Sequence, residues 1–112
     1  MAVIPKELVH PVKLTSSPVT YYTAYKCRTI IDKCTIHSHD TVNRNVIISI
    51  VSSGGDVSES ILVQRSIAPG ETYLCPEVVG HDLDSQSTIV ATCEGEGSFV
   101  DLRVSGREIT GI

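Results

Sequence analysis

The sequence predicts an all-β protein, either an antiparallel β-sandwich or a jelly-roll-like single domain, with an extended N-terminal arm. Of the 112 residues, 36 are the β-branched Val, Ile or Thr, whereas Ala occurs 4 times and Leu 6 times, so strand formers outnumber helix formers. Short apolar segments without a 3.6-residue period alternate with clusters of Gly, Pro, Asn, Asp and Ser, which is typical of strands joined by turns. The length is that of one domain.

The first 18 residues are predicted to form the arm, and residues 19–112 the β-sandwich domain. Pro5, Pro11 and Pro18 remove three backbone donors and favour extended conformations over helix. The arm is too apolar to stay in solvent. It is either an edge strand of its own domain, where proline is tolerated, or it docks on a neighbouring subunit. Partner contacts would then come from Val3, Ile4, Leu8, Val9, Val12 and Leu14.

Seven short strands are predicted after the arm. In the second of them, alternation places Ile30 on the apolar face but leaves Ile31 and Asp32 out of phase, and a β-bulge near Asp32 would reconcile the pattern. The last strand alternates most cleanly, which indicates that it is half-buried. The predicted strands are Val19 to Tyr25, Arg28 to His37, Val46 to Val51, Glu59 to Ile67, Thr72 to Leu74, Ser87 to Cys93 and Phe99 to Ser105, with turns at 52–56, 68–71 and 94–97 and room for one helical turn within 76–83.

Charge and hydropathy argue against several classes of protein. The formal net charge is -4 and the basic residues are scattered singly, so direct binding of nucleic acid is not expected. The most apolar window, Val46 to Val51, is far shorter than the roughly 20 residues of a membrane-spanning helix. The N-terminus lacks a secretory pattern, so synthesis in a reducing cytoplasm is expected. Without a CxxC pair, the cysteines are expected to be buried free thiols: Cys27, Cys34, Cys75 and Cys93.

The best candidates for chemistry are His37 and His39. Two residues apart on a strand, they would share a face and could bind a metal ion, with His81 and Asp82 as further ligands. A solvated turn at the end of a strand explains the same residues without an ion. No GxSxG motif or phosphate-binding loop is present, so we predict no enzymatic activity, no metal and no cofactor.

The aromatic residues form a single cluster in the sequence, Tyr21, Tyr22 and Tyr25. Tyrosine is enriched among the residues that dominate protein–protein binding, so these three are candidate partner-binding residues together with the arm. The alternative is that they cap one end of the core. Few other aromatic side chains exist to stack on sugars or bases.

Several turn and core stretches form a recognisable series along the chain: Tyr22 to Ala24 with Cys27 to Ile31, Val46 to Gly55, Ile67 to Tyr73, Ser87 to Ala91 and Leu102 to Ile109. In the order and spacing of these stretches, the chain from about Val19 to Ile109 resembles the capsid decoration, or cement, proteins of short-tailed bacteriophages. The motifs that carry the resemblance are turn and core features rather than active-site signatures, and other phage head or tail proteins share them. The His37 to Asp40 stretch departs from the Asn-Thr-Ser type of turn expected there.

The resemblance implies a structural virion protein on the outer surface of an icosahedral capsid. Such a protein, made in the host cytoplasm, would be a homodimer that staples neighbouring major capsid proteins against internal DNA pressure, without catalysis, nucleic acid or membrane. The first alternative is a tail or fibre β-sandwich that binds a receptor or carbohydrate. The second is a metal-dependent hydrolase built on His37, His39 and His81. On the staple interpretation, deleting Met1 to Lys13 is expected to leave a folded domain that no longer binds capsids.

Overall fold

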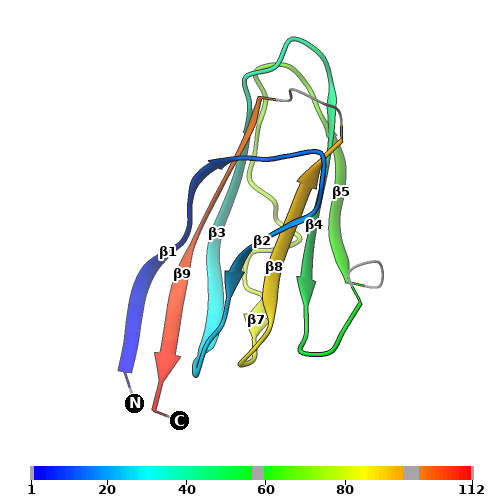
Figure 1. The fold of residues 1–112 in the computed structure, drawn as a ribbon. Helices are drawn as coiled ribbons and strands as arrows, with labels where there is room; N and C mark the ends of the chain where they lie inside the picture. Colours follow the sequence, from blue (N-terminus) through cyan, green and yellow to red (C-terminus); the bar gives the residue numbers. More distant parts are fainter. Residues whose placement is uncertain (1, 57–59, 95–98, 112) are drawn as a thin grey trace.

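Two antiparallel sheets pack face to face in the computed structural model, which describes residues 2–56, 60–94 and 99–111. The predicted β-sandwich is thereby confirmed (Figure 1). Sheet A contains, in spatial order, β1 (Ala2–Lys13), β9 (Val100–Thr110), β3 (Arg28–Ser38) and β6 (Thr72–Tyr73), with β7 (Asp82–Leu83) also beside β3. Sheet B contains β2 (Val19–Thr23), β8 (Thr88–Cys93), β4 (Arg44–Val51) and β5 (Ile61–Ile67).

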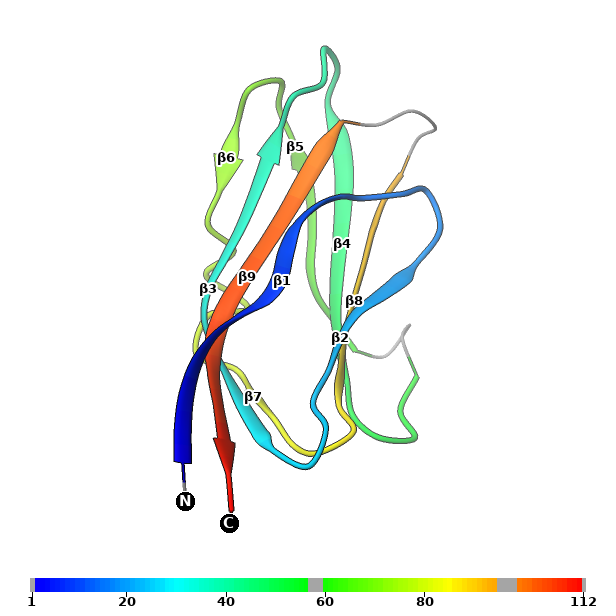
Figure 2. The same ribbon diagram turned by 60° about the vertical axis from the view of Figure 1, so that its left-hand side comes forward.

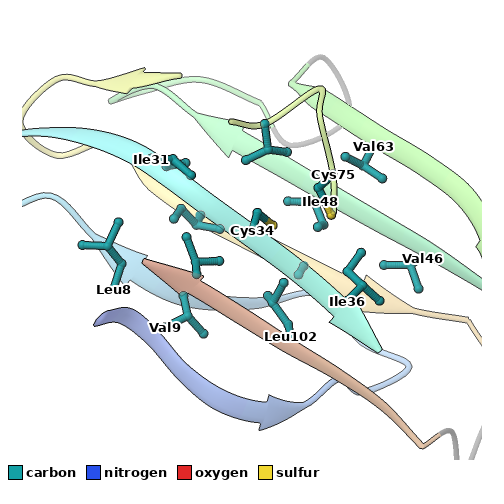
Figure 3. Close-up of a cluster of buried hydrophobic side chains, with 14 of the residues drawn as sticks. Leu8, Val9, Ile31, Cys34, Ile36, Val46, Ile48, Val63, Cys75 and Leu102 are labelled. Carbon is teal, nitrogen blue, oxygen red and sulfur yellow. The ribbon is translucent and has the colours of Figure 1, made fainter. Parts of the chain in front are cut away.

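The core lies between the two sheets and is made by alternate residues of the central strands. β9 shows the reason most clearly, since Val100, Leu102 and Val104 are buried while Asp101 and Arg103 between them are not. Side chains on successive strand residues point to opposite faces, so this alternation gives the strand one apolar face. In Figure 3, Leu102 of β9 and Ile36 of β3, both from sheet A, lie in one cluster with Val46 and Ile48 of β4 and Val63 of β5, which come from sheet B.

The N-terminal segment is an edge strand of this domain, the first of the two interpretations left open by the sequence. β1 pairs with β9 from Ala2 opposite Thr110 to Lys13 opposite Asp101. Figure 2 shows β1 running alongside β9 before the chain crosses to β2 in the other sheet. Residues 2–13 therefore belong to the sandwich, and the expected division near residue 18 does not separate them from it.

Two register shifts explain how an irregular sequence fits this edge. They lie between Glu7 and Val9 and between Val9 and Val12. A bulge adds one residue to a strand and so changes which face the next side chain occupies. Leu8 and Val9, adjacent in sequence, are consequently both buried in the core, which strict alternation does not allow.

The predicted bulge in the second strand is confirmed, because the register of β3 against β9 shifts between Ile31 and Lys33. The expected facing of Ile30 is wrong: Ile31 is the fully buried residue, and Ile30 is only half-buried. Strand lengths also differ from the prediction. β2 ends at Thr23 because Lys26 takes a positive φ of 52° in the turn that follows. β9 continues to Thr110, β7 was not predicted, and the predicted strand start at Glu59 and the turn residues 95–97 lie outside the described residues.

Candidate interaction surfaces

The candidate partner-binding residues divide into three groups by burial. Leu8, Val9 and Leu14 are buried in the core of their own domain, so in this structure they cannot contact a partner. Val12, Tyr21 and Tyr22 are half-buried and pack against that core. The remaining members are accessible: the exposed fractions are 50% for Val3, 46% for Ile4 and 66% for Tyr25.

These three accessible residues come from segments that meet at one end of the sandwich. Val3 and Ile4 lie at the start of β1, and Tyr25 lies in the turn between β2 and β3. Figure 1 shows that the start of β1, the end of β9 and the β2–β3 turn are all at the end where both chain termini lie. We call this surface the terminal end and define it as Val3, Ile4, Tyr25, Lys26 and Arg28.

Local geometry explains why apolar side chains stay exposed there. Ile4 lies opposite Glu108 and Val3 opposite Ile109 in the β1–β9 ladder. Successive side chains of a strand point to opposite faces, so a single layer cannot cover both Val3 and Ile4. β1 is also the outermost strand of sheet A, with β9 as its one neighbour there. One face and one edge of this segment are therefore available to another molecule.

A polar pocket of about 410 Å³ adjoins the terminal end. Beside it, Arg28 forms an ion pair with Asp82. The same contact lowers the pKa of the Asp82 carboxyl and raises the pKa of the Arg28 guanidinium, mainly through the hydrogen bond between them. Both side chains thus stay charged at neutral pH. The pocket is lined by Lys26, Cys27, Arg28, Asp84, Ser85 and Gly111.

A polar cluster joins the two sheets behind the terminal end. Tyr22 of β2 donates its hydroxyl to Glu108 Oε2 of β9 at 2.5 Å, and the hydroxyl lies 2.7 Å from Thr29 Oγ1 of β3. Lys6 Nζ of β1 reaches Glu108 Oε1 at 3.3 Å. The Tyr22 hydrogen bond, followed by Lys6, lowers the pKa of Glu108, whereas burial and Glu108 raise the pKa of Tyr22. The cluster therefore fixes the outer parts of β1 and β9 onto sheet B.

Replacing Glu108 with Gln is expected to reduce the free energy of unfolding at neutral pH by about 1 kcal/mol, the usual size of one lost hydrogen bond. The folded-state pKa of Glu108 lies below its ordinary value of 4.5. Its contribution is therefore complete above that value and disappears as the pH falls through the lower folded-state pKa. Urea unfolding of wild type and Glu108→Gln should give a difference that is constant down to about pH 5 and then shrinks.

The matched control for this series is Asp84→Asn, a neutralised carboxyl on an exposed loop residue. It should change the free energy of unfolding by less than about 0.5 kcal/mol at any of these pH values. A Glu108→Gln difference that grows as the pH falls would contradict the role assigned to the ionised Glu108 carboxylate.

The outer face of sheet A is exposed to solvent and carries several ion pairs. Arg107 contacts Asp32 with an Nη2–Oδ1 distance of 2.9 Å, and Arg103 Nη2 lies 3.5 Å from Glu7 Oε2. All four side chains are about a third or more exposed. Exposed pairs of this kind contribute little to stability. These four residues give this part of the face both positive and negative charges and no apolar surface.

The histidine candidates for a metal site are not brought together. His37 and His39 do meet, with ring centroids 4.5 Å apart, near the end of β3. The backbone of His81, however, lies beside Ile31 near the other end of that strand. Within residues 2–56, 60–94 and 99–111, no group of three or more His, Cys, Asp or Glu side chains is placed to bind a metal ion.

Other contacts account for these histidines as parts of a hydrogen-bonded loop. His37 Nδ1 lies 2.6 Å from Thr72 Oγ1, and His39 Nε2 lies 2.9 Å from Asp101 Oδ2. Asp40 next to them accepts hydrogen bonds from Arg44 and from the backbone of the loop, and Arg44 lowers the pKa of its carboxyl to about 2. The ionised carboxylate thus organises the turn between β3 and β4.

Comparison of the chain with family models, with curated proteins and with solved structures found no match in any of the three. Among the described residues, no helix is long and apolar enough to cross a membrane.

Proposed function

We propose that this protein is a structural component of a phage virion that binds the outer surface of an icosahedral capsid and staples neighbouring major capsid proteins. The observation that carries the proposal is the terminal end, where Val3, Ile4 and Tyr25 are exposed together on a rigid sandwich. The resemblance described above supports the same assignment. The mechanism is binding alone, since apolar and aromatic anchors surrounded by charged residues are typical of protein interfaces.

The β1 edge suits attachment to a capsid protein. An exposed strand edge offers backbone donors and acceptors to an extended segment of a partner, and the side chains on either face add specificity. The polar cluster of Tyr22, Glu108 and Lys6 keeps this edge in place. A preorganised surface loses less conformational entropy on binding than a flexible arm does.

A homodimer is the proposed active form, because a twofold symmetric protein presents two equivalent surfaces to two neighbouring capsid subunits. Two linked contacts raise the overall affinity far above that of either alone. A staple can therefore stabilise a shell even when each interface is weak.

The variant Val3→Glu places a charge at the terminal end and is expected to reduce capsid binding at least tenfold. The carboxylate would be buried without a partner in the contact with the capsid protein, which is unfavourable. Val42→Glu is a closely matched control: Val42 is 51% exposed against 50% for Val3, and it lies in the β3–β4 loop at the opposite end of the sandwich (Figure 1). Binding to empty capsids of the encoding phage is measured by co-sedimentation.

The two variants are first compared by thermal unfolding, where both should match wild type. Equal loss of capsid binding in Val3→Glu and Val42→Glu, or no loss in either, would contradict the use of the terminal end.

The alternative of a carbohydrate-binding tail or fibre module has one observation in its favour, the exposed aromatic side chains of Tyr25 and Phe99, at 66% and 54%. Sugar binding needs aromatic platforms close together. Tyr25 follows β2 at the terminal end, whereas Phe99 precedes β9 at the other end (Figure 1). A glycan array with no specific binding would remove this alternative.

A further inference from the structure

Two cysteines far apart in sequence lie together in the core. Cys34 is on β3, and Cys75 is in the connection between β6 and β7. Both are fully buried, and Figure 3 shows their sulfur atoms on the same side of β3, between the two sheets. A hydrogen bond between the two thiols and their burial raise the pKa of Cys34. Burial and this contact therefore favour the neutral form of the Cys34 thiol in the reduced protein.

A surface pocket adjoins one member of the pair. A surface pocket of about 240 Å³ lies where β3 faces the β6–β7 connection, and Cys34 is part of its wall. A small molecule in this pocket would lie next to Cys34, and Cys75 is fully buried in the core. The pocket is lined by Lys33, Cys34, Thr35, Leu74 and Val79.

Cys75 lies in a connection between two short strands rather than in a long strand. It is flanked by β6 and β7, which have two residues each. Cys75 has a positive φ of 47°, and its carbonyl accepts the amide of Val78 at 3.0 Å in the following turn. A disulfide needs a sulfur–sulfur distance of about 2.05 Å and a suitable dihedral angle, and a short connection reaches them more easily than two rigid strands.

We propose that Cys34 and Cys75 form a redox site, in which a low-molecular-weight disulfide entering through the adjoining pocket converts the two thiols into an intrachain disulfide. The Cys34 thiol loses its proton to solvent and attacks one sulfur of oxidised glutathione, and the first glutathione leaves as a thiol. The Cys75 thiol then loses its proton and attacks the mixed disulfide, which releases the second glutathione. Two protein thiols are oxidised, and one glutathione disulfide is reduced to two thiols.

The disulfide joins the β6–β7 connection to β3 covalently. Closing a loop of this length restricts the unfolded chain and is expected to raise the melting temperature by roughly 10 °C. The thiol pair would stay reduced in a cytoplasm and become oxidised outside it. This inference rests on the core geometry alone and is independent of capsid binding.

The test is to incubate the purified full-length chain with oxidised glutathione at about pH 8.5, where the thiolate fraction is larger than at neutral pH, and well below the melting temperature. Intact mass spectrometry should show the loss of two hydrogen atoms, and non-reducing peptide mapping should show Cys34 linked to Cys75. The melting temperature should rise and return on adding dithiothreitol. Cys93→Ala, at a buried cysteine on β8, should still form the link, whereas Cys34→Ala and Cys75→Ala should not.

Peptide mapping of the wild-type protein shows whether Cys34 is linked to Cys75 even if one of the variants does not fold. A link that involves Cys27 or Cys93, a stable glutathione adduct on Cys34, or an unchanged mass in the native protein would each overturn the proposal.

Discussion

Deletion of residues 1–13 is expected to unfold the protein or to lower its free energy of unfolding by roughly 5 kcal/mol or more, a large part of the stability of a small domain. The deletion removes β1, which pairs with β9 along its length. It also removes Leu8 and Val9 from the core and exposes one edge of β9. This expectation replaces the one from sequence, which treated the segment as a separable arm.

Circular dichroism with urea unfolding measures this effect. The control is the full-length double variant Val3→Ser, Ile4→Ser, which removes two exposed side chains and keeps the strand. It should unfold within about 1 kcal/mol of wild type. A truncated chain with a cooperative transition at the wild-type midpoint would show that β1 contributes nothing essential to the core.

Replacing Gly106 with Ala is expected to lower the free energy of unfolding by roughly 3 kcal/mol, as overpacking between fixed backbones does. A Cβ at this position would lie 2.2 Å from the carbonyl oxygen of Ile30 and 3.0 Å from Leu8 Cδ1. The first of these atoms is backbone in the paired strand β3, so β9 and β3 would have to separate. Gly106 thus allows β1, β9 and β3 to approach closely where the chain bulges at Asp32.

Ser105→Ala is the matched control, one position earlier on β9 and half-buried in the wall of a pocket on the outer face. Thermal or urea unfolding should place it within about 0.5 kcal/mol of wild type. If Gly106→Ala unfolded at the same urea concentration as Ser105→Ala, the result would contradict the claim that β9 and β3 lie too close together at Gly106 to accept a Cβ.

The parts of the fold that follow a local pattern were predictable from sequence. Alternation in β9 identified its buried face, and the interruption at Asp32 identified a bulge. The bulge in β1 had no such signal, because Leu8 and Val9 are adjacent and a register shift alone makes both of them buried. Prolines in an apolar segment are compatible with an edge strand and with a docking arm alike, so composition could not decide between them.

The candidate site depended on pairings between distant segments, which no local pattern specifies. The sequence made Val3, Ile4 and Tyr25 candidate contact residues but could not indicate that they share one end of the molecule. Glu108, 86 positions from Tyr22, was missed because only the register of β9 brings the two side chains together. The same holds for the Cys34 and Cys75 thiols, while His81, which was only a candidate further ligand beside His37, lies elsewhere.

The proposed stapling function is tested most directly by counting the copies of wild-type protein that bind to empty capsids of the encoding phage, per copy of the major capsid protein. A staple should saturate at a fixed ratio close to one protein per capsid subunit, and capsids carrying it should withstand higher temperature than bare ones. Binding of only a few copies per particle, or none, would contradict the proposal and move the protein to a tail structure or away from the virion.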